Sequence, residues 1–150
     1  MKELLISSLE ETERLAQTIA DLLQPGDVLT LEGDLGAGKT TFTKGLAKGL
    51  GIQRTVNSPT FTILKQYEDG RIPLNHMDVY RLADQEEDLG WDELFYGESV
   101  TIIEWAHLIE DDLPEERLDI RIERLSDTER KFVFRPFGER YEKLCKEIYV

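Results

Sequence analysis

The stretch that decides the fold is Gly33-Asp34-Leu35-Gly36-Ala37-Gly38-Lys39-Thr40. It matches the phosphate-binding pattern G-x-x-x-x-G-K-[ST] in full. Its glycines let the backbone adopt conformations that a side chain would block, so that N–H groups can approach phosphate oxygens. The N-terminus of a following helix adds a partial positive charge. The stretch therefore predicts a nucleotide-binding loop, or P-loop, between a strand and a helix.

The residues on both sides of this loop fit that context. Val28 to Leu31 is a short β-rich run typical of a buried strand. From Lys39 onward the apolar residues have helical spacing, and Gly51 supplies a C-terminal stop. A glycine-rich turn that only joined two elements would not require Lys and Thr at this offset, so we favour the P-loop.

The remaining sequence alternates between strand and helix patterns. Strands are predicted at residues 2–7, 61–67, 72–78, 100–103, 118–124 and 131–134. Helices are predicted after a capping box at Ser8 and Glu11, over residues 85–95, and from Gly138 onward. Residues 51–60 form a predicted loop, residues 68–71 a hairpin turn, and Pro73 favours an edge strand. No repeat or long linker divides the chain, which predicts a single domain over residues 1–150.

Composition limits the possible functions. The chain has 150 residues and a formal charge of −13, because 31 Asp and Glu outnumber 18 Lys and Arg. An uncharged run no longer than Thr55 to Leu64 excludes a membrane span, and the early Glu10-Glu11 pair argues against a signal peptide. We therefore expect a cytoplasmic protein. So acidic a surface repels phosphate backbones, so any role near RNA requires a partner that makes the contacts.

Lone Cys145 excludes both an internal disulfide and a thiolate metal cluster. We interpret it as a small core hydrophobe on the last helix.

Several polar residues are candidates for phosphate chemistry. The Lys39 ammonium can reach the β- and γ-phosphates, and the Thr40 hydroxyl can ligate Mg²⁺. Glu104 directly follows the buried strand 100–103, where a metal-binding carboxylate is common. Asp78 is a second candidate, although it fits equally well as a helix N-cap or as a partner of Arg81.

Two further residues have open alternatives. The hydroxyl of Thr60 lies where switch segments occur and can sense the γ-phosphate or Mg²⁺, or the residue is simply a junction between loop and strand. Trp105, next to Glu104, is either a docking residue or a core aromatic, and we favour a functional position.

Four segments together resemble one family. They are residues 33–41, Ser58-Pro59-Thr60-Phe61, His76-x-Asp78-x-Tyr80-Arg81-Leu82 and Ile103-Glu104-Trp105. The combination is similar to the TsaE (YjeE) family, the bacterial ATPases of tRNA threonylcarbamoyladenosine (t6A) synthesis. The resemblance extends from about Ser8 to Arg130, and the joint pattern is far more specific than the P-loop alone.

The resemblance implies an α/β, P-loop NTPase-like three-layer fold with a mixed, partly antiparallel central sheet. It also implies Mg²⁺-dependent ATP hydrolysis and assembly with TsaD and TsaB, which modify adenosine 37 of tRNA, so that tRNA is reached only through the complex. In this reading Lys39, Asp78 and Glu104 are catalytic, and Thr40 and Glu104 hold Mg²⁺. The residues implied to contact ATP are Thr12, Gly33, Asp34, Leu35, Gly36, Ala37, Gly38, Lys39, Thr40, Thr41, Thr60, Asp78 and Arg130.

Other P-loop classes remain as alternatives. A GTPase is disfavoured, because the chain has no Asn-Lys-x-Asp motif and no Asp followed three residues later by Gly. A small-molecule kinase requires a mobile lid with arginines, whereas the arginines here are scattered. A nucleotide-dependent adaptor without significant turnover is the non-enzymatic alternative.

Overall fold

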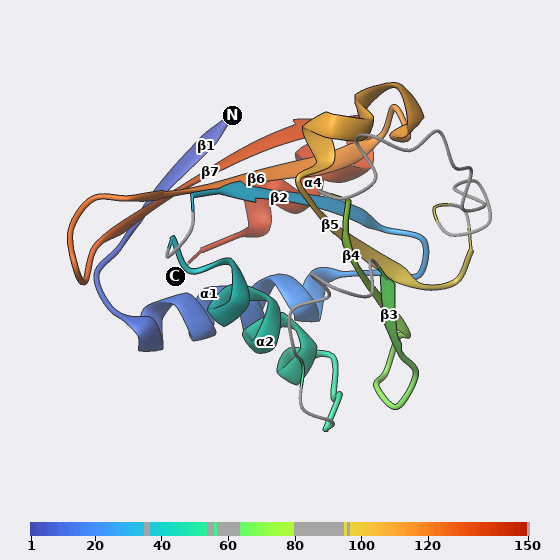
Figure 1. The fold of residues 1–150 in the computed structure, drawn as a ribbon, viewed down its shortest axis with the longest axis horizontal. Helices are drawn as coiled ribbons and strands as arrows, with labels where there is room; N and C mark the ends of the chain where they lie inside the picture. Colours follow the sequence, from blue (N-terminus) through green and yellow to red (C-terminus); the bar gives the residue numbers. More distant parts are fainter. Residues whose placement is uncertain (35–36, 54–55, 57–63, 80–94, 96, 150) are drawn as a thin grey trace.

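A seven-stranded sheet forms the centre of the computed structural model, which describes residues 1–34, 37–53, 56, 64–79, 95 and 97–149. The strand order is β1-β7-β6-β2-β5-β4-β3 (Figure 1). The strands are β1 (Lys2–Ile6), β2 (Val28–Gly33), β3 (Leu64–Tyr67), β4 (Leu74–Asp78), β5 (Val100–Glu104), β6 (Arg117–Arg124) and β7 (Arg130–Phe137). The helices are α1 (Leu9–Leu22), α2 (Lys39–Gly49), the 3-10 helix η2 (Ala106–Asp112) and α4 (Glu139–Glu147).

The sheet is mixed, as the resemblance to the TsaE family implied. β2 pairs in parallel with both β5 and β6, and β5 pairs in parallel with β4. The pairs β1–β7, β6–β7 and β3–β4 are antiparallel. Because parallel strands end at the same edge of a sheet, the loop after β2 lies at the edge where β5 and β4 also end.

The elements form three layers. Apolar residues of α1, α2 and α4 share one large core cluster with alternate residues of the sheet, including Leu29 and Leu31 of β2. A smaller cluster on the other face joins η2, Phe95 and residues of β4 and β5. Figure 1 shows α1 and α2 side by side below the sheet, with η2 above it. The expected α/β architecture is confirmed.

The start of α1 and the end of α2 have recognisable caps. The Ser8 hydroxyl accepts a hydrogen bond from the Glu11 N–H at 3.1 Å, which confirms the N-cap. Glu11 reaches one residue further than expected, to the Ser7 N–H at 2.7 Å. This bond lowers the pKa of the Glu11 carboxyl. At the end of α2, Gly51 has φ of +85°, and its N–H donates to the Lys48 carbonyl at 3.0 Å, as in a Schellman ending.

The last helix is tied to the central strand by a buried hydroxyl. Tyr141 of α4 accepts a hydrogen bond from the Val28 N–H at 2.9 Å. Burial raises the pKa of Tyr141 to about 12, so the phenol stays neutral. Cys145, on the same helix, is buried in the core as expected, and burial raises the pKa of its thiol.

The edge position predicted from Pro73 is wrong. β4 is an interior strand between β3 and β5. Pro73 precedes β4 and takes part in pairing only through its carbonyl, which accepts from the Val100 N–H at 2.8 Å. Its missing N–H therefore interrupts no ladder.

The sequence also did not predict η2. The helix predicted over residues 85–95 lies outside the described residues except for Phe95, as do residues 61–63 of one predicted strand.

None of the helices in the described part of the chain combines the length and apolar character that a membrane-spanning segment requires.

Gly49→Ala tests the close approach of α1 and α2. A Cβ at Gly49 would lie 2.6 Å from the Ala20 Cβ and 3.1 Å from the Gln17 Cα, so the helices must move apart. We expect the free energy of unfolding, measured with urea, to fall by about 1–2 kcal/mol, because overpacking outweighs the better helix propensity of alanine. Lys48→Ala, at an exposed position of the same turn, is the control and should change stability by less than about 0.5 kcal/mol. Equal or higher stability of Gly49→Ala would contradict this account.

Candidate functional site

The loop after β2 has the backbone geometry that a P-loop needs. Gly38 adopts a left-handed φ of +107°, which a side chain would disfavour. A Cβ at Gly33 would lie only 2.8 Å from the Ile122 carbonyl oxygen, so only glycine fits there. The Ala37 N–H donates to the Asp34 carbonyl at 2.9 Å and closes a turn within the loop.

The N-terminus of α2 is suited to an anion. Its N-cap is Gly38, which offers no side chain to satisfy the first helical N–H groups. The first turn contains no acidic residue, so no carboxylate offsets the positive end of the helix dipole. Lys39, the first residue of α2, adds a full positive charge at the same place. The loop and helix therefore form a strongly anion-attracting end.

Two buried carboxylates face this end. Asp78 and Glu104 are the last residues of β4 and β5, and they are direct neighbours in the parallel register. Only 6% of Asp78 and 7% of Glu104 is exposed. Lys39 Nζ lies 3.9 Å from Glu104 Oε1, which makes a loose ion pair. The structure thus brings together the three residues that the sequence predicted to be catalytic.

His76 completes this cluster, although the sequence assigned it no role. Its Nε2 lies 2.7 Å from Glu104 Oε2, and both side chains are buried. The signal was present in the pattern, because His76 and Asp78 alternate on one strand and so face the same side. The pattern did not show that β5 is the neighbouring strand, so it could not identify Glu104 as the partner of His76.

Trp105 also contacts Lys39. The Lys39 ammonium lies 4.6 Å from the centre of the Trp105 ring, a cation–π contact. Trp105 is half-buried and has a left-handed backbone with φ of 62°, which is costly for a residue other than glycine. This conformation turns the chain from β5 into η2. Trp105 therefore belongs to the site, and its expected role in docking stays a prediction.

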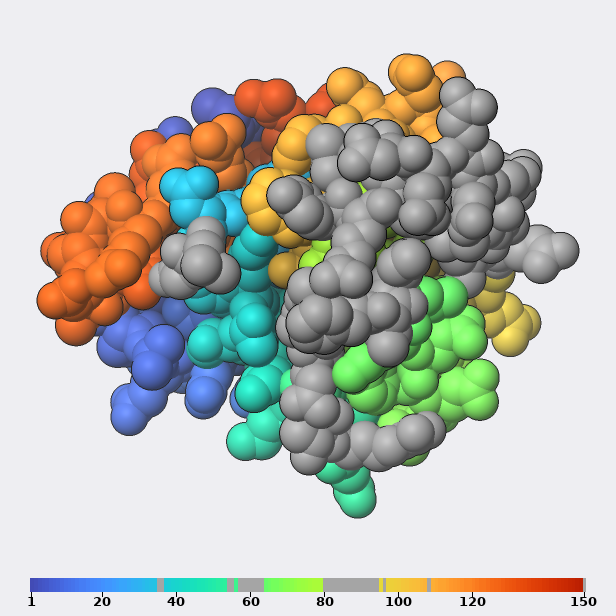
Figure 2. All heavy atoms as spheres, in the orientation of Figure 1, coloured from blue at the N-terminus to red at the C-terminus, as the bar shows by residue number. Residues whose placement is uncertain are grey.

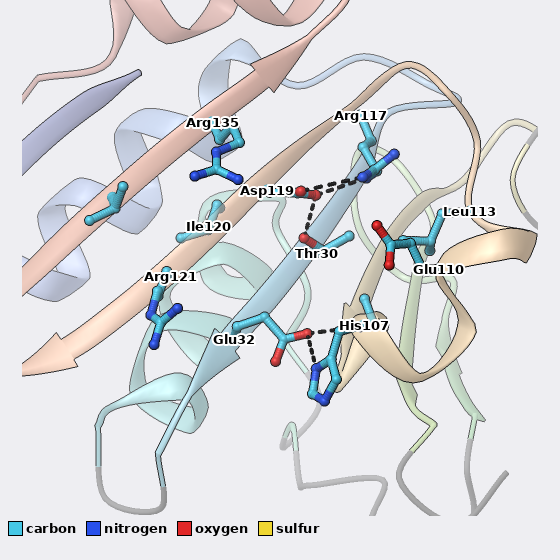
Figure 3. A pocket seen from close by; sticks show the side chains of 12 residues that line it. Thr30, Glu32, His107, Glu110, Leu113, Arg117, Asp119, Ile120, Arg121 and Arg135 are labelled. Carbon is cyan, nitrogen blue, oxygen red and sulfur yellow. Dashed lines mark hydrogen bonds and ion pairs between the residues drawn. The ribbon is translucent and has the colours of Figure 1, made fainter. Parts of the chain in front are cut away.

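η2 is anchored to the strand that precedes the P-loop. The backbone N–H and the ring Nδ1 of His107 lie 3.1 Å and 3.0 Å from Glu32 Oε1. Figure 3 shows this contact at the rim of a cavity of about 210 Å³ on the face of the sheet opposite α1 and α2. Across that cavity, Asp119 accepts hydrogen bonds from Thr30 and Arg117. None of the predicted site residues that the structure describes lines this cavity, but its Glu32–His107 contact fixes the chain beside Trp105.

A separate cleft of about 440 Å³ lies beside the P-loop, and Gly38 is part of its lining. It is formed by the start of α1, the P-loop and the hairpin between β6 and β7, which adjoin on one side of the molecule (Figure 2). Its lining includes Thr12, Ala37, Gly38, Thr41 and Arg130 from the predicted nucleotide site. The lining also includes Ser7 and Ser8 before α1, and Asp127 and Thr128 of the hairpin. The sequence assigned none of these four residues a role at the nucleotide, because turn and cap residues carry no binding motif of their own.

Arg130 connects the P-loop to that hairpin. Its Nε donates to the Ala37 carbonyl at 2.9 Å, and its Nη1 donates to the Ser126 carbonyl at 2.7 Å. Arg130 therefore contacts the predicted P-loop. Thr40 is exposed in the first turn of α2. Leu35, Gly36 and Thr60 lie outside the described residues, as does Arg81, the alternative partner of Asp78.

The central β2, the glycine loop, α2 and the carboxylates on the neighbouring strands define a P-loop α/β protein. The model of the family "Threonylcarbamoyl adenosine biosynthesis protein TsaE" matches residues 6–132. The chain therefore belongs to the TsaE family, as the sequence motifs indicated.

Individual relatives agree with this assignment. The tRNA threonylcarbamoyladenosine biosynthesis protein TsaE of Bacillus subtilis (strain 168) is 63% identical over 139 residues, which cover 93% of this chain and 88% of the relative. The protein of the same name from Treponema pallidum (strain Nichols) is 47% identical over 126 residues, covering 83% and 93%. A crystal structure of YdiB from Bacillus subtilis matches with a TM-score of 0.86 and 54% identity, covering 98% of this chain and 93% of that one.

Arg130→Ala tests the link between hairpin and P-loop. Losing a hydrogen bond from a charged donor should let the loop open more often, so we expect amide hydrogen exchange at Ala37 to accelerate about tenfold. Arg124→Ala is the matched control, because the Arg124 guanidinium donates its hydrogen bonds to Ser126 and Asp127 within the same hairpin. Equal exchange rates in the two variants would contradict the proposed link.

Proposed function

We propose that the protein binds and hydrolyses ATP with Mg²⁺, and that this activity supports threonylcarbamoyl transfer to adenosine 37 of tRNA by TsaD and TsaB. The observation that carries the proposal is the juxtaposition of the P-loop lysine with a buried carboxylate, at 3.9 Å between Lys39 Nζ and Glu104 Oε1. Family membership supports the connection to t6A synthesis.

The phosphates would be held by the P-loop and α2. The N–H groups at the start of α2 and the Lys39 ammonium supply positive charge where the triphosphate carries its negative charge. The loose ion pair between Lys39 and Glu104 can exchange for contacts to phosphate, because its N–O distance of 3.9 Å exceeds that of a charge-assisted hydrogen bond. Asp78, buried beside Glu104, would orient the attacking water or a water bound to the metal.

The donor set suits Mg²⁺. Glu104 offers a carboxylate oxygen and Thr40 a hydroxyl, the hard oxygen ligands that this ion prefers. Among the described residues, no group of three or more His, Cys, Asp or Glu forms a metal cage. This composition fits Mg²⁺ in P-loop proteins, where phosphates and water complete the coordination. When bound, Mg²⁺ would neutralise the negative charge that develops on the phosphates.

The base and ribose of ATP would occupy the cleft beside Gly38. This cleft adjoins the P-loop and is lined by Thr12 and Arg130, both expected near the nucleotide. Thr12 is buried, and its hydroxyl lies 3.4 Å from the Ser8 carbonyl oxygen. The cleft adjoins the proposed phosphate site, because Ala37, Gly38 and Thr41 also line it.

The acidic charge of the chain suggests how the activity reaches tRNA. A net charge of −13 opposes direct binding of an RNA backbone. Contact through TsaD and TsaB avoids this repulsion. ATP turnover should then depend on the partners, which separates this proposal from a kinase that acts on a small molecule alone and from an adaptor without turnover.

Lys39→Ala tests the proposed function directly. Phosphate release from ATP is measured for the purified protein alone and with TsaD and TsaB added. We expect slow basal turnover that the partners stimulate, and a loss of about a hundredfold or more in Lys39→Ala, because the variant removes the ammonium that lies at the start of α2 beside Glu104. Lys44→Ala, at an exposed position of α2, is the control. Ordinary turnover by Lys39→Ala would refute the assignment, whereas partner binding that depends on ATP without phosphate release would favour the adaptor.

Glu104→Ala tests the metal site. We expect Mg²⁺-dependent turnover to fall about a hundredfold, while ATP affinity changes by less than about tenfold, because the P-loop amides remain. Turnover is measured across a Mg²⁺ titration, and nucleotide affinity by calorimetry. If the Mg²⁺ dependence were unchanged, the metal role would belong to Asp78, which Asp78→Ala would then reveal.

A further inference from the structure

His76 is a buried polar residue whose environment calls for a functional explanation. It lies on β4, and only 2% of it is exposed. Its Nδ1 has no hydrogen-bond partner in the part of the chain that the structure describes. An unsatisfied polar atom in a core is costly, and a leucine would fill a purely structural position without that cost. The single polar contact that the structure gives His76 is to Glu104.

The contact divides the two oxygens of Glu104 between different neighbours. An ionised carboxylate can only accept hydrogen bonds, so with Glu104 ionised the 2.7 Å contact to Oε2 requires the His76 tautomer that carries its hydrogen on Nε2. The other oxygen, Oε1, faces Lys39 Nζ at 3.9 Å. The short bond to the histidine and the longer contact to the lysine mean that His76 sets the orientation of the carboxylate.

The register of the sheet makes this arrangement rigid. His76 pairs with Ile102 and Asp78 with Glu104 along the parallel β4–β5 ladder. His76 therefore approaches Glu104 diagonally from the neighbouring strand, while Asp78 lies directly opposite. Without the histidine, Glu104 would be free to turn both oxygens towards Lys39.

We propose that His76 is a positioning residue that holds Glu104 through Oε2, so that Oε1 remains available to a divalent cation and Lys39 remains available to phosphate. The inference rests on the proposed function, because it assigns Glu104 to the metal. It goes further in naming the side chain that orients the metal ligand. Hydrogen-bonded neighbours of metal-binding carboxylates commonly have this effect on affinity.

The test compares variants of the full chain by electron paramagnetic resonance of Mn²⁺ added with ADP, a readout that needs no hydrolysis. His76→Leu should weaken Mn²⁺ binding to the ADP complex about tenfold, while ADP binding without metal changes less than about threefold. His76→Gln keeps an N–H at a similar reach and should restore Mn²⁺ affinity to within about threefold. His76→Asn is too short to reach Glu104 and should behave as His76→Leu.

Asn75→Leu is the control for general damage to β4. Asn75 is also buried, but its amide Nδ2 lies 3.5 Å from Thr101 Oγ1, on the opposite face of the strand. Its Mn²⁺ affinity should equal that of the unmodified protein. Equal weakening by Asn75→Leu and His76→Leu would overturn the inference, because the effect would then be structural.

Two further outcomes separate this inference from the function on which it rests. If His76→Leu bound Mn²⁺ as tightly as the unmodified protein, the positioning role alone would be wrong. If the unmodified protein bound Mn²⁺ no better than Glu104→Ala, the metal role of Glu104 would be wrong and the inference would fall with it. If His76→Leu does not fold, the test compares the Mn²⁺ affinities of His76→Asn and His76→Gln. Equal affinities in these two variants would overturn the inference.

Discussion

The parallel pairing of β2, β5 and β4 is the constraint on which the rest of the site depends. This pairing brings the ends of the three strands to one edge of the sheet, where the glycine loop, Glu104 and Asp78 meet. The core below them holds that edge in place, because α1 and α2 pack so closely that Gly45 and Gly49 leave no room for a Cβ. A shift of one residue in this register would turn each carboxylate to the opposite face.

Electrostatic balance explains how such a site persists in so acidic a chain. Asp78 and Glu104 are adjacent and buried, an arrangement that is unfavourable without compensating groups. Lys39, the positive end of α2 and the His76 hydrogen bond supply that compensation around Glu104. Trp105 keeps the lysine near the acids through a cation–π contact at 4.6 Å. The site thus places the Lys39 ammonium and the positive end of α2 against its two acids, in a chain whose formal charge is −13.

Sequence reasoning succeeded where the chemistry is contiguous in the chain. The order of strand, glycine loop and helix was predictable because each local pattern agrees with its neighbours. The Glu104 position was predictable because a carboxylate directly follows a buried run. Sequence reasoning wrongly placed the strand after Pro73 at the edge of the sheet, because the sequence of one strand does not determine its position among the others. It assigned no role to His76 for the same reason. Sequence reasoning also did not identify four residues that line the cleft beside Gly38, namely Ser7, Ser8, Asp127 and Thr128. These are ordinary turn and cap residues by type, so their type alone does not indicate a binding site.

By itself the sequence determined the P-loop, the order of strands and helices around it and the buried strand that ends at Glu104, because glycine geometry, hydrophobic periodicity and motif spacing are local properties. The mixed α/β sheet was implied by the resemblance of four sequence segments to the TsaE family. The tertiary structure alone decided that Lys39, His76, Asp78 and Glu104 form one cluster and that Arg130 reaches the P-loop. These contacts join residues far apart in the chain, and their partners are fixed by strand order, register and helix packing. No local pattern contains that information, because it arises only when the separate elements share one core.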